Sequence, residues 1–111
     1  MTPVWSLEAI ADLVALRAYI ARDDPAAAQR VAFHIIRNVE TLLSGRPEMG
    51  RPGRVPGTRE LVIPRTPYVV PYRLVDGALQ ILRVFHSSRR WPQTLGDVAD
   101  LREASSEANS T

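Results

Sequence analysis

The chain has 111 residues, 45% of them apolar and 23% charged, with a formal net charge of +2 and no cysteine. This length and apolar content fit one folded domain and exclude a wholly disordered chain. The chain holds only two histidines, its apolar runs are shorter than the ~20 residues of a membrane span, and its N-terminus lacks a secretory signal, so we expect a cytoplasmic protein with no disulfide, metal or cofactor.

Residues 7–22 are predicted to form a first helix. Ser6 is a good N-cap for it, and Glu8 lies in the first turn, where a negative charge is favourable. A short extended segment, Thr2–Trp5, precedes the cap. The stripe at helical spacing comprises Ile10, Leu13, Val14, Arg17, Ile20 and Ala21, and it is widened by Leu7, Ala11 and Ala18.

A second helix is predicted from Pro25 to about Ser44. Asp24 can cap this helix, and Pro25 suits its first position because the N–H that proline lacks would have no partner there. Gly45, followed by Pro47, ends it. The short turn between the helices makes them antiparallel. The buried stripe of the second helix is expected to comprise Ala28, Val31, Ala32, Ile35, Val39 and Leu42.

Three strands are predicted after a loop at residues 45–57, which holds four Gly and three Pro. They are expected at Thr58–Ile63, Tyr68–Val75 and Ala78–His86, and Asp76-Gly77 between the last two is a strong two-residue hairpin turn.

Pro71 conflicts with a simple central strand, because proline has no N–H for the ladder. We therefore expect a bulge at this point, or a position whose N–H faces away from a partner. Along the third strand, alternation places Leu79, Ile81 and Phe85 on one side and Leu82 and Val84 on the other.

These elements predict an α+β fold in which an N-terminal antiparallel helical hairpin packs on a small, mainly antiparallel sheet of three to four strands. The domain is expected to span residues 1–96. Residues 97–111 read as an acidic polar tail, with a short helix at Asp97–Ala104 and a frayed end. One hairpin covers only one face of the sheet, so the other face needs solvent, the tail or a partner.

The charge is distributed unevenly along the chain. All 14 basic residues are arginine, and residues 46–90 hold nine of them against three acids. This distribution favours an anionic partner for the middle of the chain. The guanidinium group suits carboxylate and phosphate alike, so an acidic peptide and a phosphate backbone both remain open.

The candidate contact residues lie on the strands and directly after them. Arg59 and Arg83 sit in otherwise apolar strands, where a covered charge needs a bound anion or a carboxylate such as Glu60 or Asp76. The arginines that would converge if the strands form a meander are Arg59, Arg73, Arg83, Arg89 and Arg90.

The end of the third strand offers no hydrolase triad. His86 adjoins Ser87 and Ser88, but neighbours on a strand point to opposite faces, so no Ser–His relay is implied. His86 then fits either a hydrogen-bonded strand end or a functional side chain. Trp91 either stacks on a base or a partner side chain or anchors the chain after the strand.

Four segments in this order resemble toxins of the RelE/ParE superfamily from bacterial type II toxin–antitoxin systems, with the ParE branch the closer match. The segments are Arg46–Pro52, Gly57–Leu61, Tyr68–Arg73 and Ile81–Arg90. The resemblance implies a toxin neutralised by a cognate, ParD-like antitoxin. The C-terminal segment of such an antitoxin wraps the toxin and its N-terminal domain binds operator DNA, so the toxin meets operator DNA only indirectly.

The two branches of the superfamily imply different activities. ParE-like members are associated with inhibition of DNA gyrase, whereas RelE-like members cleave mRNA in the ribosomal A site. The ribonuclease branch usually carries a phosphate-binding arginine in the middle strand, where this chain has Val69. A valine offers no charge to stabilise a pentacovalent phosphorane.

We therefore expect a toxin that binds and inhibits DNA gyrase without catalysis. The expected contacts to target or antitoxin are Arg59, Arg73, Arg83, His86, Arg89, Arg90 and Trp91. A ribosome-dependent mRNA endoribonuclease is the alternative, with Glu48, Arg83 and His86 as its catalytic residues and Arg51 and Arg54 as partial substitutes for basic residues of that branch. A non-catalytic nucleic-acid-binding module is a second alternative.

Overall fold

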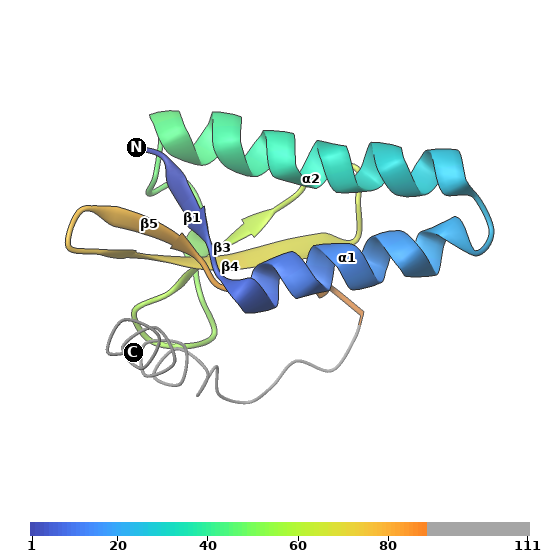
Figure 1. The fold of residues 1–111 in the computed structure, drawn as a ribbon. Coiled ribbons are helices and arrows are strands. Elements are labelled where there is room, and N and C mark those ends of the chain that lie inside the picture. The colour runs from blue at the N-terminus through green and yellow to red at the C-terminus, as the bar shows by residue number, and fades with distance from the viewer. Residues whose placement is uncertain (89–111) are drawn as a thin grey trace, which may run out of the picture.

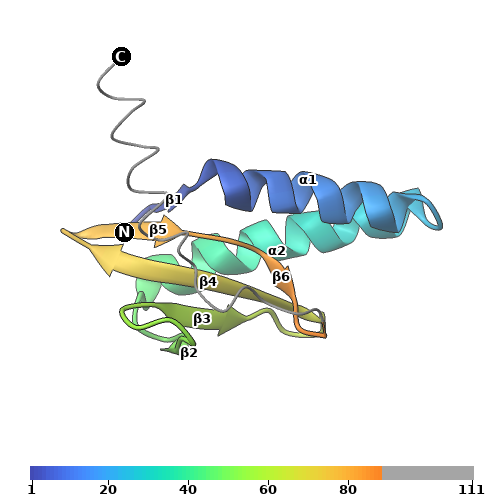
Figure 2. The same cartoon turned by 90° about the horizontal axis from the view of Figure 1, so that it is seen from below.

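A helical hairpin lies along one face of a mixed six-stranded sheet in the computed structural model, which describes residues 1–88. Figures 1 and 2 show both helices on the same side of the sheet. The elements in chain order are β1 (Pro3–Trp5), α1 (Leu7–Ala21), α2 (Pro25–Gly45), β2 (Arg51–Pro52), β3 (Arg59–Val62), β4 (Tyr68–Val75), β5 (Ala78–Ile81) and β6 (Phe85–His86). The α+β prediction is confirmed, whereas the short helix and acidic tail predicted within residues 97–111 lie outside the described residues.

Both helices begin at the predicted caps. The Ser6 hydroxyl accepts a hydrogen bond from the N–H of Ala9 at 3.0 Å, and the Asp24 carboxylate accepts one from the N–H of Ala27 at 3.0 Å. Each bond satisfies a donor that has no partner within the first helical turn. The buried face of α2 follows the predicted stripe at Ala28, Ala32, Ile35 and Val39. Leu43, which the stripe did not include, is also buried, and the predicted Leu42 is only partly buried.

The predicted face of α1 is partly wrong. Ala9 and Leu16 are its buried residues, and Leu13 and Ile20 pack against the core beside them. Leu7 and Val14, which were assigned to the stripe, are 81% and 64% exposed. The sequence of α1 is apolar almost all round, so helical periodicity alone does not select one face.

β4 is the centre of the sheet. The strand order is β1-β5-β4-β3-β2, and β6 pairs with the first residues of β4. The predicted extended segment near the N-terminus is β1, which pairs with β5 in parallel, while the other pairs are antiparallel. The predicted hairpin turn is confirmed, since Asp76 and Gly77 both have positive φ, 51° and 75°.

A bulge faces Pro71, as predicted. Tyr72 pairs with Ile81 and Val69 pairs with Phe85, so residues 82–84 oppose only two residues of β4. The carbonyl of Pro71 accepts from the N–H of Leu82 at 3.0 Å, which shows that Pro71 turns toward the bulge. The ladder is therefore interrupted where proline supplies no donor.

The bulge also changes which side chains reach the core. Val84 belongs to the same core cluster as Leu79 and Ile81, so its predicted place on the opposite side is wrong. One extra residue shifts the alternation by one position, and the side chains beyond it exchange faces. The sheet contributes to this core Leu61, Ile63, Tyr68, Val70, Tyr72, Leu79, Ile81 and Val84.

Candidate functional site

The polar backbone groups of the bulge are bound by α1. The Ser6 hydroxyl donates to the carbonyl of Leu82 at 2.8 Å, and the N–H of Ser6 donates to the carbonyl of Ile81 at 2.9 Å. The Asp12 carboxylate accepts from the N–H of Val84 at 2.9 Å. These bonds satisfy groups that a regular ladder would have paired. They fix the start of α1 to the end of β5.

Arg83 is held by the same carboxylate. Its Nε and Nη2 donate to the two oxygens of Asp12 at 2.8 and 3.0 Å, and its guanidinium lies 4.7 Å from the centre of the Phe85 ring. Such a bidentate pair fixes both the position and the plane of the guanidinium. Arg83 does require a carboxylate, as expected, but its partner is Asp12 of α1 rather than Glu60 or Asp76.

Glu60 organises the loop that precedes β3. Its side chain is only 3% exposed, and its carboxylate accepts from Nε and Nη2 of Arg51 at 3.2 and 3.1 Å and from the backbone N–H of Arg54 at 2.9 Å. Nε of Arg54 lies 3.8 Å from the same carboxylate. The buried carboxylate of Glu60 thus has several donors around it, and these bonds hold the loop at residues 51–58 against β3.

Arg59 lies in a corner between the end of α2 and the sheet. Its Nη1 donates to the carbonyls of Glu48 and Gly50 at 3.1 and 2.8 Å. The N–H of Gly50 donates to the hydroxyl of Tyr72 at 2.8 Å. Burial raises the pKa of the Tyr72 phenol above its ordinary value of 10.0, and the Gly50 hydrogen bond and the charge of Arg59 oppose that rise.

The backbone approaches the Tyr72 ring closely in this corner. A Cβ at Gly50 would lie 2.6 Å from a carbon of the Tyr72 ring and 2.9 Å from the carbonyl oxygen of Glu60. Such distances are far inside van der Waals contact, so glycine is needed at this position for its lack of a side chain. The corner joins segments that carry the resemblance, from Arg46–Pro52, Gly57–Leu61 and Tyr68–Arg73.

The predicted arginine cluster forms only in part. Arg59 and Arg73 line one pocket of about 310 Å³, together with Pro52, Gly57, Thr58 and Leu74. Nε of Arg73 donates to Oε1 of Gln80 at 2.7 Å. Arg83 lies instead against α1, because the bulge and Asp12 turn it toward the helical layer. The bulge at Pro71 was expected, but its effect on the side that Arg83 faces was not, so the predicted convergence of Arg83 with Arg59 and Arg73 is wrong.

His86 lies at the end of β4 opposite to the Arg59 corner. It pairs with Tyr68, whose ring meets the imidazole edge-on at 5.4 Å, and its Nδ1 accepts from the N–H of Ser88 at 3.1 Å. Ser88 Oγ lies 2.7 Å from the same nitrogen. The chain turns after the strand and brings Ser88 back to His86, a contact that the alternation of a regular strand does not predict.

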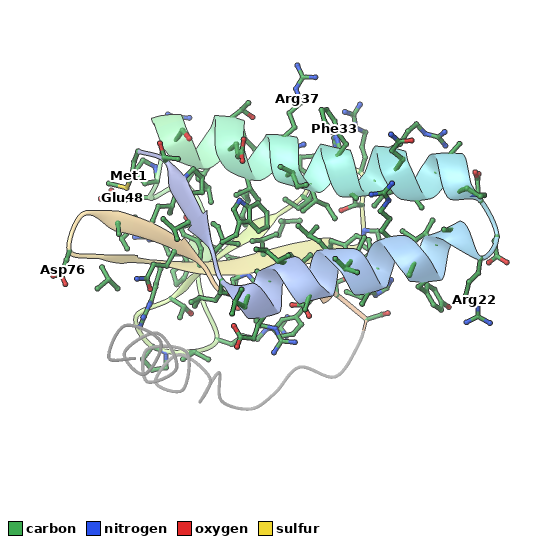
Figure 3. All side chains as sticks on the ribbon, in the orientation of Figure 1. Met1, Arg22, Phe33, Arg37, Glu48 and Asp76 are labelled. Atoms are coloured by element: carbon green, nitrogen blue, oxygen red, sulfur yellow. The ribbon has the colours of Figure 1, made fainter. Side chains whose placement is uncertain are left out.

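The structure does not gather the three residues assigned to the ribonuclease alternative. Glu48 is exposed (Figure 3), and its carbonyl accepts from Arg59 in the corner that contains Tyr72, whereas His86 pairs with Tyr68. Those two tyrosines are four positions apart along β4, which corresponds to a distance on the order of 13 Å. Arg83 is bound to Asp12. Arg89, Arg90 and Trp91 lie outside the described residues.

The helical layer carries an exposed apolar face. Leu7, Ile10 and Val14 of α1 follow one another at three- and four-residue spacing, and Ile10 is 46% exposed. Figure 3 shows Phe33 of α2 pointing away from the sheet. We call the side chains of Leu7, Ile10 and Val14 the α1 stripe. Contiguous exposed apolar groups of this kind mark interaction surfaces.

Two site residues were missed in the sequence. Asp12 lies one helical turn from the buried Ala9 and Leu16, and a charge beside a buried face signals a partner elsewhere in the fold. Tyr72 was assigned only to a strand, and nothing in its neighbours along the chain points to Gly50. Among residues 1–88 no three His, Asp or Glu side chains gather as metal ligands would, and no helix there has the length and apolarity to cross a bilayer.

Comparison with known proteins agrees with this architecture. Residues 4–91 match the family described as ParE toxin of the type II toxin–antitoxin system parDE. The protein Y4kP of Sinorhizobium fredii, a candidate toxin, is 45% identical over 91 residues, which cover 82% of this chain and 93% of Y4kP. Toxin RelE2 of Caulobacter vibrioides is 38% identical over 86 residues, 78% of this chain and 94% of that protein.

A solved structure of the chromosomal ParDE toxin–antitoxin system from P. aeruginosa has the same fold. It superposes with a TM-score of 0.69 and 32% sequence identity, covering 78% of this chain and 95% of the other. A small α+β toxin of the RelE/ParE superfamily is thus the class that fold and sequence define. This chain belongs to the ParE toxin family of type II toxin–antitoxin systems.

Proposed function

We propose that this toxin inhibits DNA gyrase by binding it, without cleaving RNA. The proposal is supported above all by the separation of Glu48 from His86, because acid–base catalysis needs its groups within hydrogen-bond reach of one substrate. The buried Val69 in β4 supports it further, since the ribonuclease branch places a phosphate-binding arginine there. The match to the ParE toxin family supports this target further, because the resemblance associates ParE-like toxins with gyrase.

The cognate partner is a ParD-like antitoxin, and we assign the α1 stripe to it. An antitoxin helix that lays apolar side chains at three- and four-residue spacing would bury Leu7, Ile10 and Val14. The stripe is exposed in the described structure and lies on a helix that is fixed to the sheet through Ser6 and Asp12. A rigid apolar helix face loses little entropy when a partner covers it.

A gyrase assay tests the target directly. Purified toxin is added to gyrase, ATP and relaxed circular DNA, and supercoiled and linear products are separated on agarose gels. We expect supercoiling to fall, or linear DNA to accumulate, as toxin rises, and we expect added antitoxin to reverse the effect. Unchanged supercoiling at a large molar excess of folded toxin would contradict the proposal.

The same preparation is tested on mRNA bound to stalled ribosomes. We expect no cleavage with wild-type protein. Cleavage that His86→Ala abolishes and His34→Ala preserves would support the ribonuclease alternative instead. Tight binding to free DNA or RNA that falls steeply with salt and needs no protein partner would support a nucleic-acid-binding module.

A further inference from the structure

The outer face of α2 carries two arginines that no acid neutralises within residues 1–88. Arg30 and Arg37 are seven residues apart, which is about two helical turns, so they lie on the same side of the helix, about 10 Å apart along its axis. Both are exposed, and in the described part of the chain neither forms an ion pair or a side-chain hydrogen bond. Figure 3 shows Arg37 pointing away from the sheet.

The turn between β3 and β4 lies against the middle of this helix. Nε2 of His34 donates to the carbonyl of Pro64 at 3.0 Å, since a carbonyl can only accept. His34 is four residues after Arg30 and three before Arg37, so it lies on the same side of α2. Arg65 follows Pro64, is exposed, and forms no ion pair with any residue of the described range. The turn thus brings a third unneutralised guanidinium to the helix.

The backbone of Arg65 has a conformation that favours glycine. Its φ is 62°. The carbonyl of Ile63 accepts from the N–H of Thr66 at 3.3 Å, so Arg65 is the third residue of a four-residue turn, where glycine or asparagine is usual when φ is positive. Other side chains rarely adopt this region. An arginine at such a position points to a use for its side chain.

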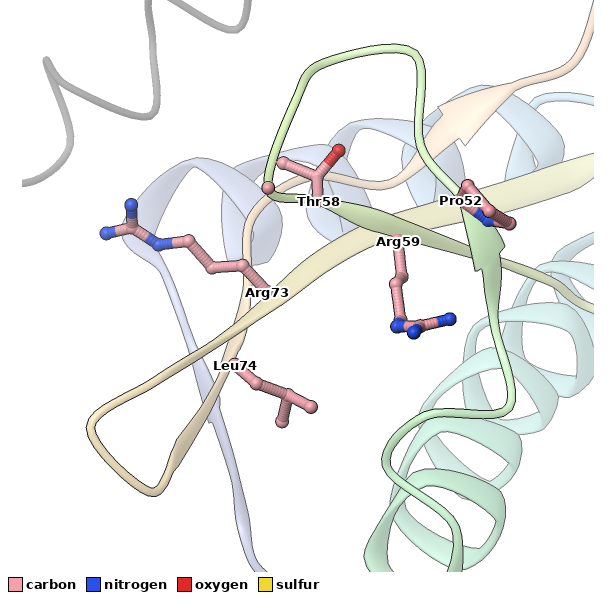
Figure 4. Close-up of a pocket in the computed structure, with 6 residues that line it drawn as sticks. Pro52, Thr58, Arg59, Arg73 and Leu74 are labelled. Carbon is pink, nitrogen blue, oxygen red and sulfur yellow. The ribbon is translucent and has the colours of Figure 1, made fainter.

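The pocket between Arg59 and Arg73 is arranged differently. Figure 4 shows the two side chains pointing in different directions. Two backbone carbonyls already bind Nη1 of Arg59. By contrast, the guanidinium groups beside α2 bind no other side chain of the described residues. We call Arg30, Arg37 and Arg65 the α2 arginine patch.

We propose that the α2 arginine patch binds the phosphate backbone of duplex DNA. The axial spacing of Arg30 and Arg37, about 10 Å, corresponds to about three base pairs at ~3.4 Å each, so both side chains can reach phosphates of one strand. A guanidinium group binds a phosphate through two parallel hydrogen bonds. The DNA that gyrase holds is the duplex concerned, and this part of the inference rests on the proposed function.

The same face offers little to a protein partner. Along α2, all of which the structure describes, Phe33 is the only large apolar side chain that is exposed, and Glu40 is the only acid. Protein interfaces have an apolar centre, whereas surfaces that bind DNA are more polar and strongly positive. The charge of the patch therefore complements a phosphate backbone better than a folded protein surface.

Three phosphate contacts give weak binding that depends strongly on salt. Each neutralised phosphate contributes about −0.9 to the slope of log affinity against log salt, so three contacts predict a slope of about −2.7. Dissociation constants of sequence-independent binding lie at about 10⁻⁴ to 10⁻⁶ M. The patch would thus orient and retain the toxin on DNA that gyrase already holds, and would not bring the toxin to DNA by itself.

Fluorescence anisotropy measures this slope, with a labelled duplex of about 20 base pairs titrated by the full chain at several salt concentrations. We expect Arg37→Gln to weaken binding about tenfold at ~50 mM salt and to reduce the slope to about −1.8, and Arg30→Gln to do the same. Arg22→Gln is the matched control, because Arg22 is exposed and points to the opposite side in Figure 3. We expect it to leave the affinity within twofold and the slope unchanged.

Arg65→Gly tests the third contact without straining the fold. Glycine adopts a positive φ readily, so the folding stability of this variant in urea should not fall. Its affinity for the duplex should fall about tenfold at ~50 mM salt, because one phosphate contact is lost. An affinity equal to that of the wild type, in this variant or in Arg37→Gln, would overturn the inference.

Four further results would also overturn it. The wild-type chain would show no binding to the duplex at ~50 mM salt. Arg22→Gln would weaken binding as much as Arg37→Gln does, which would assign the binding to net charge. A polyglutamate peptide would bind as tightly and lose affinity equally in Arg37→Gln, which would assign the patch to an acidic protein. An RNA duplex would bind more tightly with the same dependence on Arg37, which would assign the patch to RNA.

A gyrase assay separates this inference from the proposed function. At ~50 mM salt, Arg37→Gln should require about tenfold more toxin than the wild type to inhibit supercoiling, and Arg22→Gln should not. Equal inhibition by Arg37→Gln and the wild type would refute the patch and leave gyrase inhibition intact. A wild-type chain that binds the duplex through the patch and leaves supercoiling unchanged would refute the proposed function and leave the DNA contact intact.

Discussion

Replacing Asp12 by alanine is expected to lower the free energy of unfolding by about 2 to 3 kcal/mol. The N–H of Val84 loses its acceptor, which costs about 2 kcal/mol at this partly buried site. Arg83 loses both its hydrogen bonds to the carboxylate, but its side chain is 27% exposed and can rehydrate, so this loss is about 1 kcal/mol. The higher helix propensity of alanine returns about 0.5 kcal/mol.

Urea denaturation followed by far-UV circular dichroism measures this change, with Asp12→Asn and Glu40→Ala as comparisons. The asparagine keeps an oxygen for Val84 and is expected to cost only about 1 kcal/mol. Glu40 is exposed on α2, so its replacement should stay within about 0.5 kcal/mol of wild type. Equal losses for Asp12→Asn and Asp12→Ala would refute a role for the Val84 bond, and a loss no larger than that of Glu40→Ala would refute the whole argument.

Three further predictions concern the corner and the α1 stripe. Gly50→Ala is expected to lower the free energy of unfolding by about 1 to 3 kcal/mol in urea, whereas Gly45→Ala, with nothing within 4 Å of the new Cβ, costs less than about 1 kcal/mol. The pKa of Tyr72 is raised in the folded state, so the unfolded chain loses the phenol proton first and the free energy of unfolding should fall as the pH rises above 10. Tyr72→Phe should remove the contribution of this phenol to the pH dependence of the free energy of unfolding. An unchanged pH dependence in this variant would contradict the raised pKa of Tyr72. Val14→Asp should weaken antitoxin binding, measured by calorimetry, about 10- to 100-fold. Gln29→Asp, which adds the same charge at another exposed position, should leave binding unchanged. Equal effects of the two variants would exclude the α1 stripe as the antitoxin-binding surface.

Local chemistry allowed much of the fold to be predicted. The caps Ser6 and Asp24, the Asp76-Gly77 turn and the bulge opposite Pro71 each follow from conformational preferences of one or two residues. The buried face of α2 follows from its periodicity, because charged residues occupy its outer side. These features depend only on residues that are neighbours along the chain, so they can be predicted before the three-dimensional fold is known.

The remainder depends on contacts between distant segments. The partner of Arg83 is Asp12, 71 residues earlier, and no local pattern distinguishes that acid from Glu60 or Asp76. The parallel pairing of β1 with β5 likewise joins the two ends of the described chain. The register shift at the bulge then decides which side Val84 faces, so one extra residue altered the expected arginine cluster as well as the core.

The pairing of β1 with β5 has a consequence for the order in which the protein folds during its synthesis. Synthesis proceeds from the N-terminus, so β1, the Ser6 hydroxyl and the Asp12 carboxylate are made before residues 79–84, which contain their hydrogen-bonding partners. Such long-range pairing is the slow part of folding. An antitoxin that requires α1 seated on the sheet would consequently recognise the finished toxin and not the growing nascent chain.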